Sequence, residues 1–62
     1  MTLKDMCKVG EYTTLITVYD SKDSKIPVYT GVVGLIARQQ TICNREVSYW
    51  EIENNEIIVK VE

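Results

Sequence analysis

The segment from Val47 to Glu62 contains the pattern that most restricts the fold. Apolar and polar residues alternate on both sides of Asn54-Asn55, and asparagine tolerates the positive φ angles of a tight hairpin turn. The pattern predicts two antiparallel strands, 47–53 and 56–62. Counting outward from the turn predicts an apolar face and a mixed face, with pairs Ile52–Ile57, Trp50–Val59 and Ser48–Val61 on the first and Glu51–Ile58 and Tyr49–Lys60 on the second. We expect the apolar face, including Trp50, to be core.

The size and composition of the chain are those of a small globular domain. It has 62 residues and 45% hydrophobic residues, near the size at which only about 60% of the unfolded surface is buried on folding. No apolar run approaches the roughly 18 residues that cross a bilayer, and the start lacks the apolar segment of a signal peptide. We therefore expect one domain over 1–62, in the cytoplasm and without membrane contact.

Before the C-terminal hairpin, the sequence predicts a short helix and a second hairpin. The Thr2 hydroxyl can cap a helix that starts at Leu3 and ends at Gly10, with apolar residues on one stripe. Residues 13–20 are β-branched and aromatic, which is typical of a strand, and 26–33 return after a polar turn. If Val18 pairs with Val28, the core face carries Ile16, Val18, Val28 and Val32, and the opposite face carries Leu15, Thr17, Tyr19 and Tyr29.

Residues 34–43 are ambiguous. Leu35 to Gln40 favour a helix by composition, and the apolar residues up to Ile42 approximate a helical face, but a strand through so short a run stays open. We take a short helix. The resulting fold class is α+β, in the order α-β-β-α-β-β, with both antiparallel hairpins in one sheet and short helices packed on it.

The sequence offers little for catalysis or for a cofactor. It has no histidine, its serines lack a partner at a signature spacing, and no phosphate-binding glycine motif occurs. We interpret Cys7 and Cys43 as small buried hydrophobic residues and not as the two halves of a disulfide. We also expect the Cys7 thiol to be buried and not reactive. We expect no enzyme activity, no cofactor and no metal.

The C-terminal hairpin is acidic. From residue 44 onward, Arg45 and Lys60 stand against five glutamates, which gives about −3. Three of these glutamates cluster at the turn: Glu51, Glu53 and Glu56. They could dock on a basic partner, although solvated side chains that protect a sheet edge are the more ordinary interpretation. The acidic balance argues against direct nucleic-acid binding.

The aromatic residues carry the main functional hypothesis. If the two hairpins share one sheet, the face opposite the core gathers apolar side chains, namely Leu15, Tyr19, Tyr29, Tyr49 and Ile58. Such a patch is larger than small monomers usually expose, and tyrosine suits interfaces because its ring is buried while its hydroxyl stays wet. Either a helix covers this face or it is an interface, most simply between copies of the chain.

Three short motifs resemble a group of small bacteriophage and prophage proteins. They are Met1 to Asp5, Ile16 to Asp20, and Asn44 to Val47, together with the acidic hairpin that follows. The resemblance implies a phage accessory protein that acts by binding a host or phage component, for example a nuclease or another defence effector. It carries over no catalytic residue.

The hypotheses from the sequence are therefore three binding functions and, last, an enzyme. The first is a homo-oligomeric interaction module that uses the aromatic face. The second is a phage-encoded inhibitor that docks its acidic hairpin on a basic effector. The third is a small-ligand site between subunits.

Overall fold

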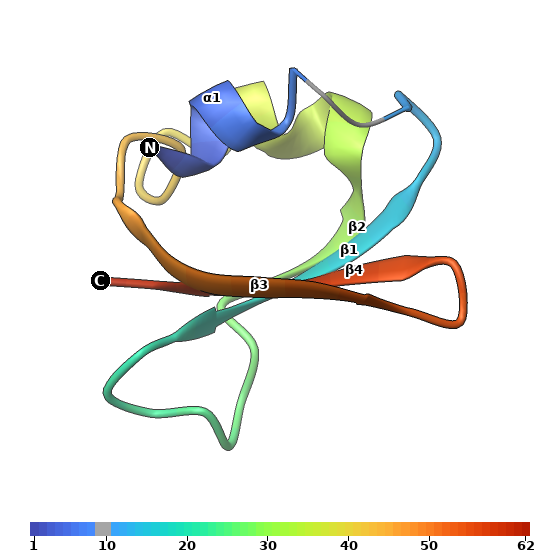
Figure 1. Cartoon of the computed structure of the whole chain (residues 1–62). Helices are drawn as coiled ribbons and strands as arrows, with labels where there is room; N and C mark the ends of the chain where they lie inside the picture. Colours follow the sequence, from blue (N-terminus) through green and yellow to red (C-terminus); the bar gives the residue numbers. More distant parts are fainter. Residues whose placement is uncertain (9–10) are drawn as a thin grey trace.

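The computed structural model describes residues 1–8 and 11–62 (Figure 1). Two short helical segments and four strands follow one another as α1 (Leu3–Met6), β1 (Leu15–Asp20), β2 (Tyr29–Val32), the 3₁₀ helix η1 (Val33–Arg38), β3 (Val47–Glu53) and β4 (Glu56–Val61). The predicted α+β class and element order are confirmed. The predicted end of the first helix, at Val9-Gly10, lies outside the described residues.

The four strands form one mixed sheet in the order β2-β1-β4-β3. Each hairpin is antiparallel, and the two hairpins join through a parallel pairing of β1 with β4. The sheet order was open from the sequence, because it depends on which strands of the two hairpins meet. The consequence is that β1 and β4 are central, whereas β2 and β3 are edge strands.

The C-terminal hairpin has the predicted turn and nearly all of the predicted register. Asn54 and Asn55 have φ angles of 53° and 63°, as a two-residue primed turn requires. All predicted pairs are present except Ser48–Val61: the register shifts so that Val47 opposes Val61. Ser48 is the extra residue of a bulge, and its Oγ donates to the Lys60 carbonyl oxygen over 3.2 Å.

The first hairpin is shorter than predicted and shifted by one residue. Val18 is opposite Tyr29, not Val28, so Tyr29 shares the face of the buried Val18 and packs against the core. The placement of Tyr29 on the opposite face was therefore wrong. Pro27 has no N–H to donate to the ladder, and β2 begins only at Tyr29. Residues 26–28 therefore belong to the loop.

The helical segments lie on one side of the sheet, and the loop of residues 21–28 projects on the other (Figure 1). α1 begins as predicted, because the Thr2 Oγ1 accepts from the Asp5 N–H over 3.2 Å. The segment predicted as a helix over 34–43 is η1 and a following turn; Ile36 and Ile42 are buried, but Leu35 is exposed. In the 3₁₀ helix Val33 and Ile36, three residues apart, share the buried side.

The core lies between this helical layer and the middle of the sheet. Its buried members are Leu3, Met6, Ile16, Val18, Val33, Ile36, Ile42, Cys43, Val59 and Val61. Trp50, which we expected to be core, is 52% exposed. Its partner Val59 is fully buried on the central strand β4, whereas Trp50 lies on the edge strand β3, where only Val47 is even partly buried. One apolar face of the hairpin is thus divided between core and surface.

Candidate functional site: the exposed surfaces of the sheet

The outer face of the sheet, opposite the helical layer, brings together four of the five predicted interface residues. Leu15 and Tyr19 come from β1, Ile58 from β4 and Tyr49 from β3. No helix of the described residues lies on this side of the sheet (Figure 1). Tyr29 is the exception, because the shifted register turns it to the helical side.

Charged side chains interrupt the apolar residues of the outer face. Lys60 lies between Tyr19 and Tyr49 in the ladder, and its Nζ is 5.7 Å from the centre of the Tyr49 ring. The Tyr49 hydroxyl donates to Glu51 Oε2 over 2.9 Å, and this hydrogen bond to a carboxylate raises the pKa of Tyr49. The face is therefore an alternation of rings and charges rather than a continuous apolar patch.

The three predicted acidic docking residues also share the outer face, near the hairpin turn. Glu53 is directly opposite Glu56, and Glu51 is two residues along β3. Glu56 accepts a hydrogen bond from Thr17 Oγ1 over 2.8 Å and is half-buried, so it is held against β1. Glu51 and Glu53 are exposed, and these two carboxylates remain accessible to a partner.

Three of the large apolar residues that the sheet exposes lie on β3, and Leu15 on β1, at 55%, is a fourth. Tyr49 is 47%, Trp50 52% and Ile52 65% exposed. Tyr49 belongs to the outer face, whereas Trp50 and Ile52 belong to the helical side, so β3 presents apolar side chains on both faces at the edge of the sheet. Reasoning from the sequence placed Trp50 and Ile52 in the core, because alternation identifies a face but not whether a helix covers it.

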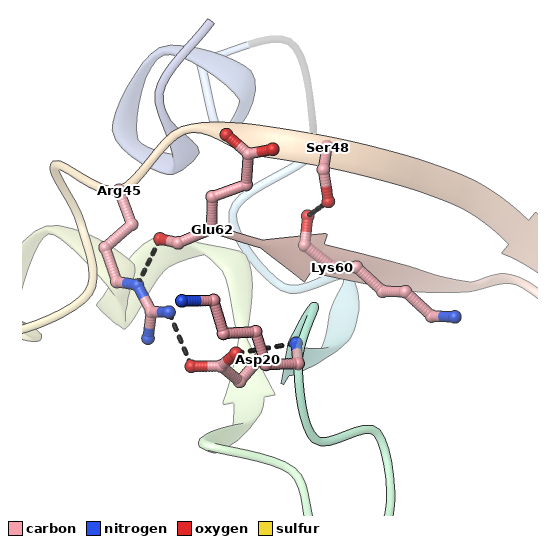
Figure 2. Close-up of polar contacts among 6 residues, drawn as sticks. Asp20, Arg45, Ser48, Lys60 and Glu62 are labelled. Carbon is pink, nitrogen blue, oxygen red and sulfur yellow. Dashed lines mark hydrogen bonds and ion pairs between the residues drawn. The ribbon is translucent and has the colours of Figure 1, made fainter.

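A second cluster, around Arg45, serves the structure (Figure 2). Arg45 Nη2 donates to Asp20 Oδ2 and Arg45 Nε to the Glu62 carbonyl oxygen, both over 2.6 Å. The hydrogen bond from Arg45, followed by that from the Lys22 N–H, lowers the pKa of the Asp20 carboxyl. The guanidinium therefore joins the end of β1 to the residue that follows β4.

A cavity of about 300 Å³ lies between α1 and η1. Lys4 of α1 lines it together with Cys7 and Lys8, which follow α1, and Val33 and Ala37 line it from η1. Burial raises the pKa of the Cys7 thiol, which favours its protonated form. Both cysteines are free thiols; Cys43 is buried, as predicted, whereas Cys7 is only half-buried.

The described residues contain neither a membrane-spanning helix nor a cluster of metal-ligating side chains. No helix in 1–8 or 11–62 is long and apolar enough to cross a membrane. Within the same ranges, no three histidine, cysteine or acidic side chains gather in a way that could hold a metal ion.

Comparison of the chain with protein-family models, with curated proteins and with solved structures finds no match. The exposed surfaces described above are therefore the features that bear on function.

Proposed function

We propose that this protein is a non-enzymatic interaction module that binds a second copy of itself through β3 and the adjoining outer face of the sheet. The observation that carries the proposal is the exposure of Tyr49, Trp50 and Ile52 on one edge strand. In a chain of 62 residues, three large apolar side chains on a single strand are a costly exposure unless another surface covers them.

The residue types support an interface. Tyrosine and tryptophan combine a large apolar ring with a polar group that stays hydrated or bonded, and both are enriched at protein–protein contacts. On the outer face, Tyr19 and Ile58 add an aromatic and an aliphatic side chain between the charged groups. Self-association is the commonest way in which a small domain covers such a surface.

The first experiment is light scattering on a gel-filtration column over a hundredfold range of concentration. We expect the mass to rise from monomer toward dimer with concentration, and Ile52→Lys to keep the protein monomeric throughout. Ile26→Lys is the matched control, because Ile26 is equally exposed but lies in the loop before β2. A wild-type monomer at every concentration, or equal effects of the two variants, would contradict the proposal.

A second function is an inhibitor that docks its acidic outer face on a cationic protein, for example a phage-encoded inhibitor of a host nuclease acting in the host cytoplasm. The observation that favours it is the direct opposition of Glu53 and Glu56, with Glu51 nearby. Like charges opposite one another destabilise a hairpin, and a cationic partner would remove that repulsion.

The test of the inhibitor function is charge reversal with a matched control. Glu51→Lys and Glu53→Lys together should abolish capture of a basic partner from host lysate, whereas Glu11→Lys, exposed and distant in the chain, should leave capture intact. Capture that survives the double reversal, or that is insensitive to salt, would exclude docking through these carboxylates.

A further inference from the structure

We infer that two copies of the chain join through the free edges of β3, antiparallel, with the two-fold axis at Glu51, so that two four-stranded sheets become one continuous sheet. This inference rests on the proposed self-association and adds its geometry. Three features of β3 support this pairing. They are the residues whose backbone groups point away from β4, the length of the free edge, and the side chains that one register brings together.

The turn determines which backbone groups of β3 are free. In a two-residue hairpin the residues flanking the turn, here Glu53 and Glu56, exchange hydrogen bonds, and every second residue outward does the same. Glu51 and Tyr49 therefore direct their N–H and C=O groups at β4. Trp50 and Ile52 direct theirs away from the sheet, so the two residues with exposed apolar side chains also carry free backbone donors and acceptors.

The free edge has a defined length. At its start, Thr2 bridges Glu46 in the antiparallel direction and the Val47 N–H donates to the Met1 carbonyl oxygen over 2.8 Å. Met1 thus occupies the edge of β3 that faces away from β4, as far as Val47. At its other end the strand stops at Glu53, before the turn. A partner strand has only residues 48–53 to pair with.

Three two-fold registers let Trp50 or Ile52 form the hydrogen-bonded pairs with the second copy. Two of these registers place unfavourable residues opposite one another. An axis at Trp50 would set Glu53 of the second copy against Val47, where Met1 already lies, and would need the bulged Ser48 as a partner. An axis at Ile52 would oppose Glu51 to Glu53 twice and leave Trp50 facing an asparagine of the turn. The register centred on Trp50 therefore loses backbone hydrogen bonds, and the register centred on Ile52 leaves Trp50 without an apolar partner.

An axis at Glu51 uses the whole free edge. Trp50 of each copy then exchanges backbone hydrogen bonds with Ile52 of the other, and both bonded pairs consist of regular strand residues. Asn54 of the second copy comes opposite Ser48, immediately beside Met1, so the second turn begins where the free edge ends. On the helical side, the indole and the Ile52 side chain of the second copy form two apolar cross-strand pairs.

The charges on the outer face also favour this register. Glu53 of the second copy lies beside Tyr49, whose ring already holds Lys60 Nζ at 5.7 Å, so opposite charges meet across each tyrosine. Glu51 opposite its own copy is the one repulsive pair. This pair opposes association, and the few paired residues also make the dimer weak and dependent on concentration.

Cysteine cross-linking tests the register directly. Under mild oxidation, Glu51→Cys should form a disulfide between copies, because cross-strand partners bring Cβ atoms about 4.5–5.5 Å apart. Mapping of the linked peptides distinguishes this disulfide from any formed by Cys7 or Cys43. Trp50→Cys, Ile52→Cys and Tyr19→Cys, each made singly, are the comparison variants, and we expect little self-linking from them.

The outcomes separate the register from the proposed function. Dominant self-linking at position 50 or 52 would overturn the axis at Glu51, and dominant linking at position 19 would overturn pairing through β3 in favour of the outer face; both leave self-association standing. A wild-type protein that stays monomeric in light scattering removes the proposed function, and with it this inference.

A second pair of variants tests the same interface without a thiol. Glu51→Gln removes the one repulsive pair and should tighten the dimer about threefold, whereas Glu11→Gln should not change its Kd. Ile52→Pro removes a backbone N–H that faces outward on an edge strand, where proline is tolerated, and should abolish the dimer while circular dichroism shows a folded monomer. A dimer that persists unchanged with Ile52→Pro, or a weaker one with Glu51→Gln, would contradict the inferred pairing.

Discussion

At the scale of single residues, Arg45 connects three distant parts of the chain. Its carbonyl oxygen accepts from the Leu3 N–H over 2.9 Å, while its side chain binds Asp20 and the Glu62 carbonyl oxygen. These hydrogen bonds help to hold α1, the end of β1 and the end of β4 together. Charged hydrogen bonds of this kind are stronger than neutral ones.

Asp20→Asn should reduce stability in a pH-dependent way. Because hydrogen bonding lowers the pKa of Asp20 in the folded state, the carboxylate contributes stability that is fully present above the unfolded-state pKa of about 3.9. The contribution is lost as the pH falls through the folded-state pKa. In urea titrations the variant should have a lower midpoint than wild type at pH 6, and the two midpoints should converge near pH 2. A constant difference across this range would exclude the charge as the cause.

A second prediction at this scale concerns Gly31 and Tyr29. A Cβ on Gly31 would lie 2.5 Å from the Tyr29 Oη, whose hydroxyl donates to the Val32 carbonyl oxygen over 3.1 Å. Gly31→Ala should displace this ring and cost about 1 kcal/mol in the free energy of unfolding. In a Tyr29→Phe background the cost should shrink, because the nearest atom is gone. Equal costs in the two backgrounds, measured as a double-mutant cycle, would contradict this account.

At the scale of the elements, the C-terminal hairpin is determined by its turn, whereas the first hairpin is determined by its surroundings. Asn54-Asn55 requires two positive φ angles and so permits one register. The loop of residues 21–28 closes instead with two side-chain turns, in which Asp20 and Asp23 accept from the N–H groups of Lys22 and Lys25. Several registers satisfy such a loop, and for this reason Tyr29 could not be placed from the sequence.

The turn yields a prediction at Asn55. Asn55→Val places a β-branched residue at a φ of 63° and should cost about 1–2 kcal/mol in the free energy of unfolding, while Asn55→Gly should be neutral or stabilising. Asn44→Val is the control, because Asn44 is exposed and is not among the positive-φ residues described. Equal effects of the two valine substitutions in thermal unfolding would show that the turn does not determine the hairpin.

At the scale of the whole molecule, the described residues form a helical layer on one side of the sheet, with the core on that side. A chain of this size buries a smaller fraction of its surface than a larger domain does, so its stability depends on few fully buried side chains. Ile36 is among the largest of these and lies in η1, a segment too short to persist without packing. The outer face and β3 are left exposed as a direct consequence.

Ile36→Ala should therefore remove much of the stability. Large-to-small substitutions at fully buried sites cost about 2–5 kcal/mol, which is comparable to the total stability expected of so small a domain. Leu35→Ala, one residue away on the exposed side of η1, should cost less than about 1.5 kcal/mol. Chemical denaturation of the two variants measures both values, and similar losses would mean that the core does not lie where the structure places it.

The sequence by itself determined the α+β class, the order of the elements, the C-terminal turn and the register of most of β3 with β4. These features depend on neighbouring residues: alternation, a capping threonine and two asparagines. Only the tertiary structure decided the order of the strands, the side of the sheet on which Tyr29 lies and the exposure of Trp50 and Ile52. Their environment depends on the parallel pairing of β1 with β4, which makes β3 an edge. Alternation within a strand shows which residues share a face, but distant segments decide whether that face is covered.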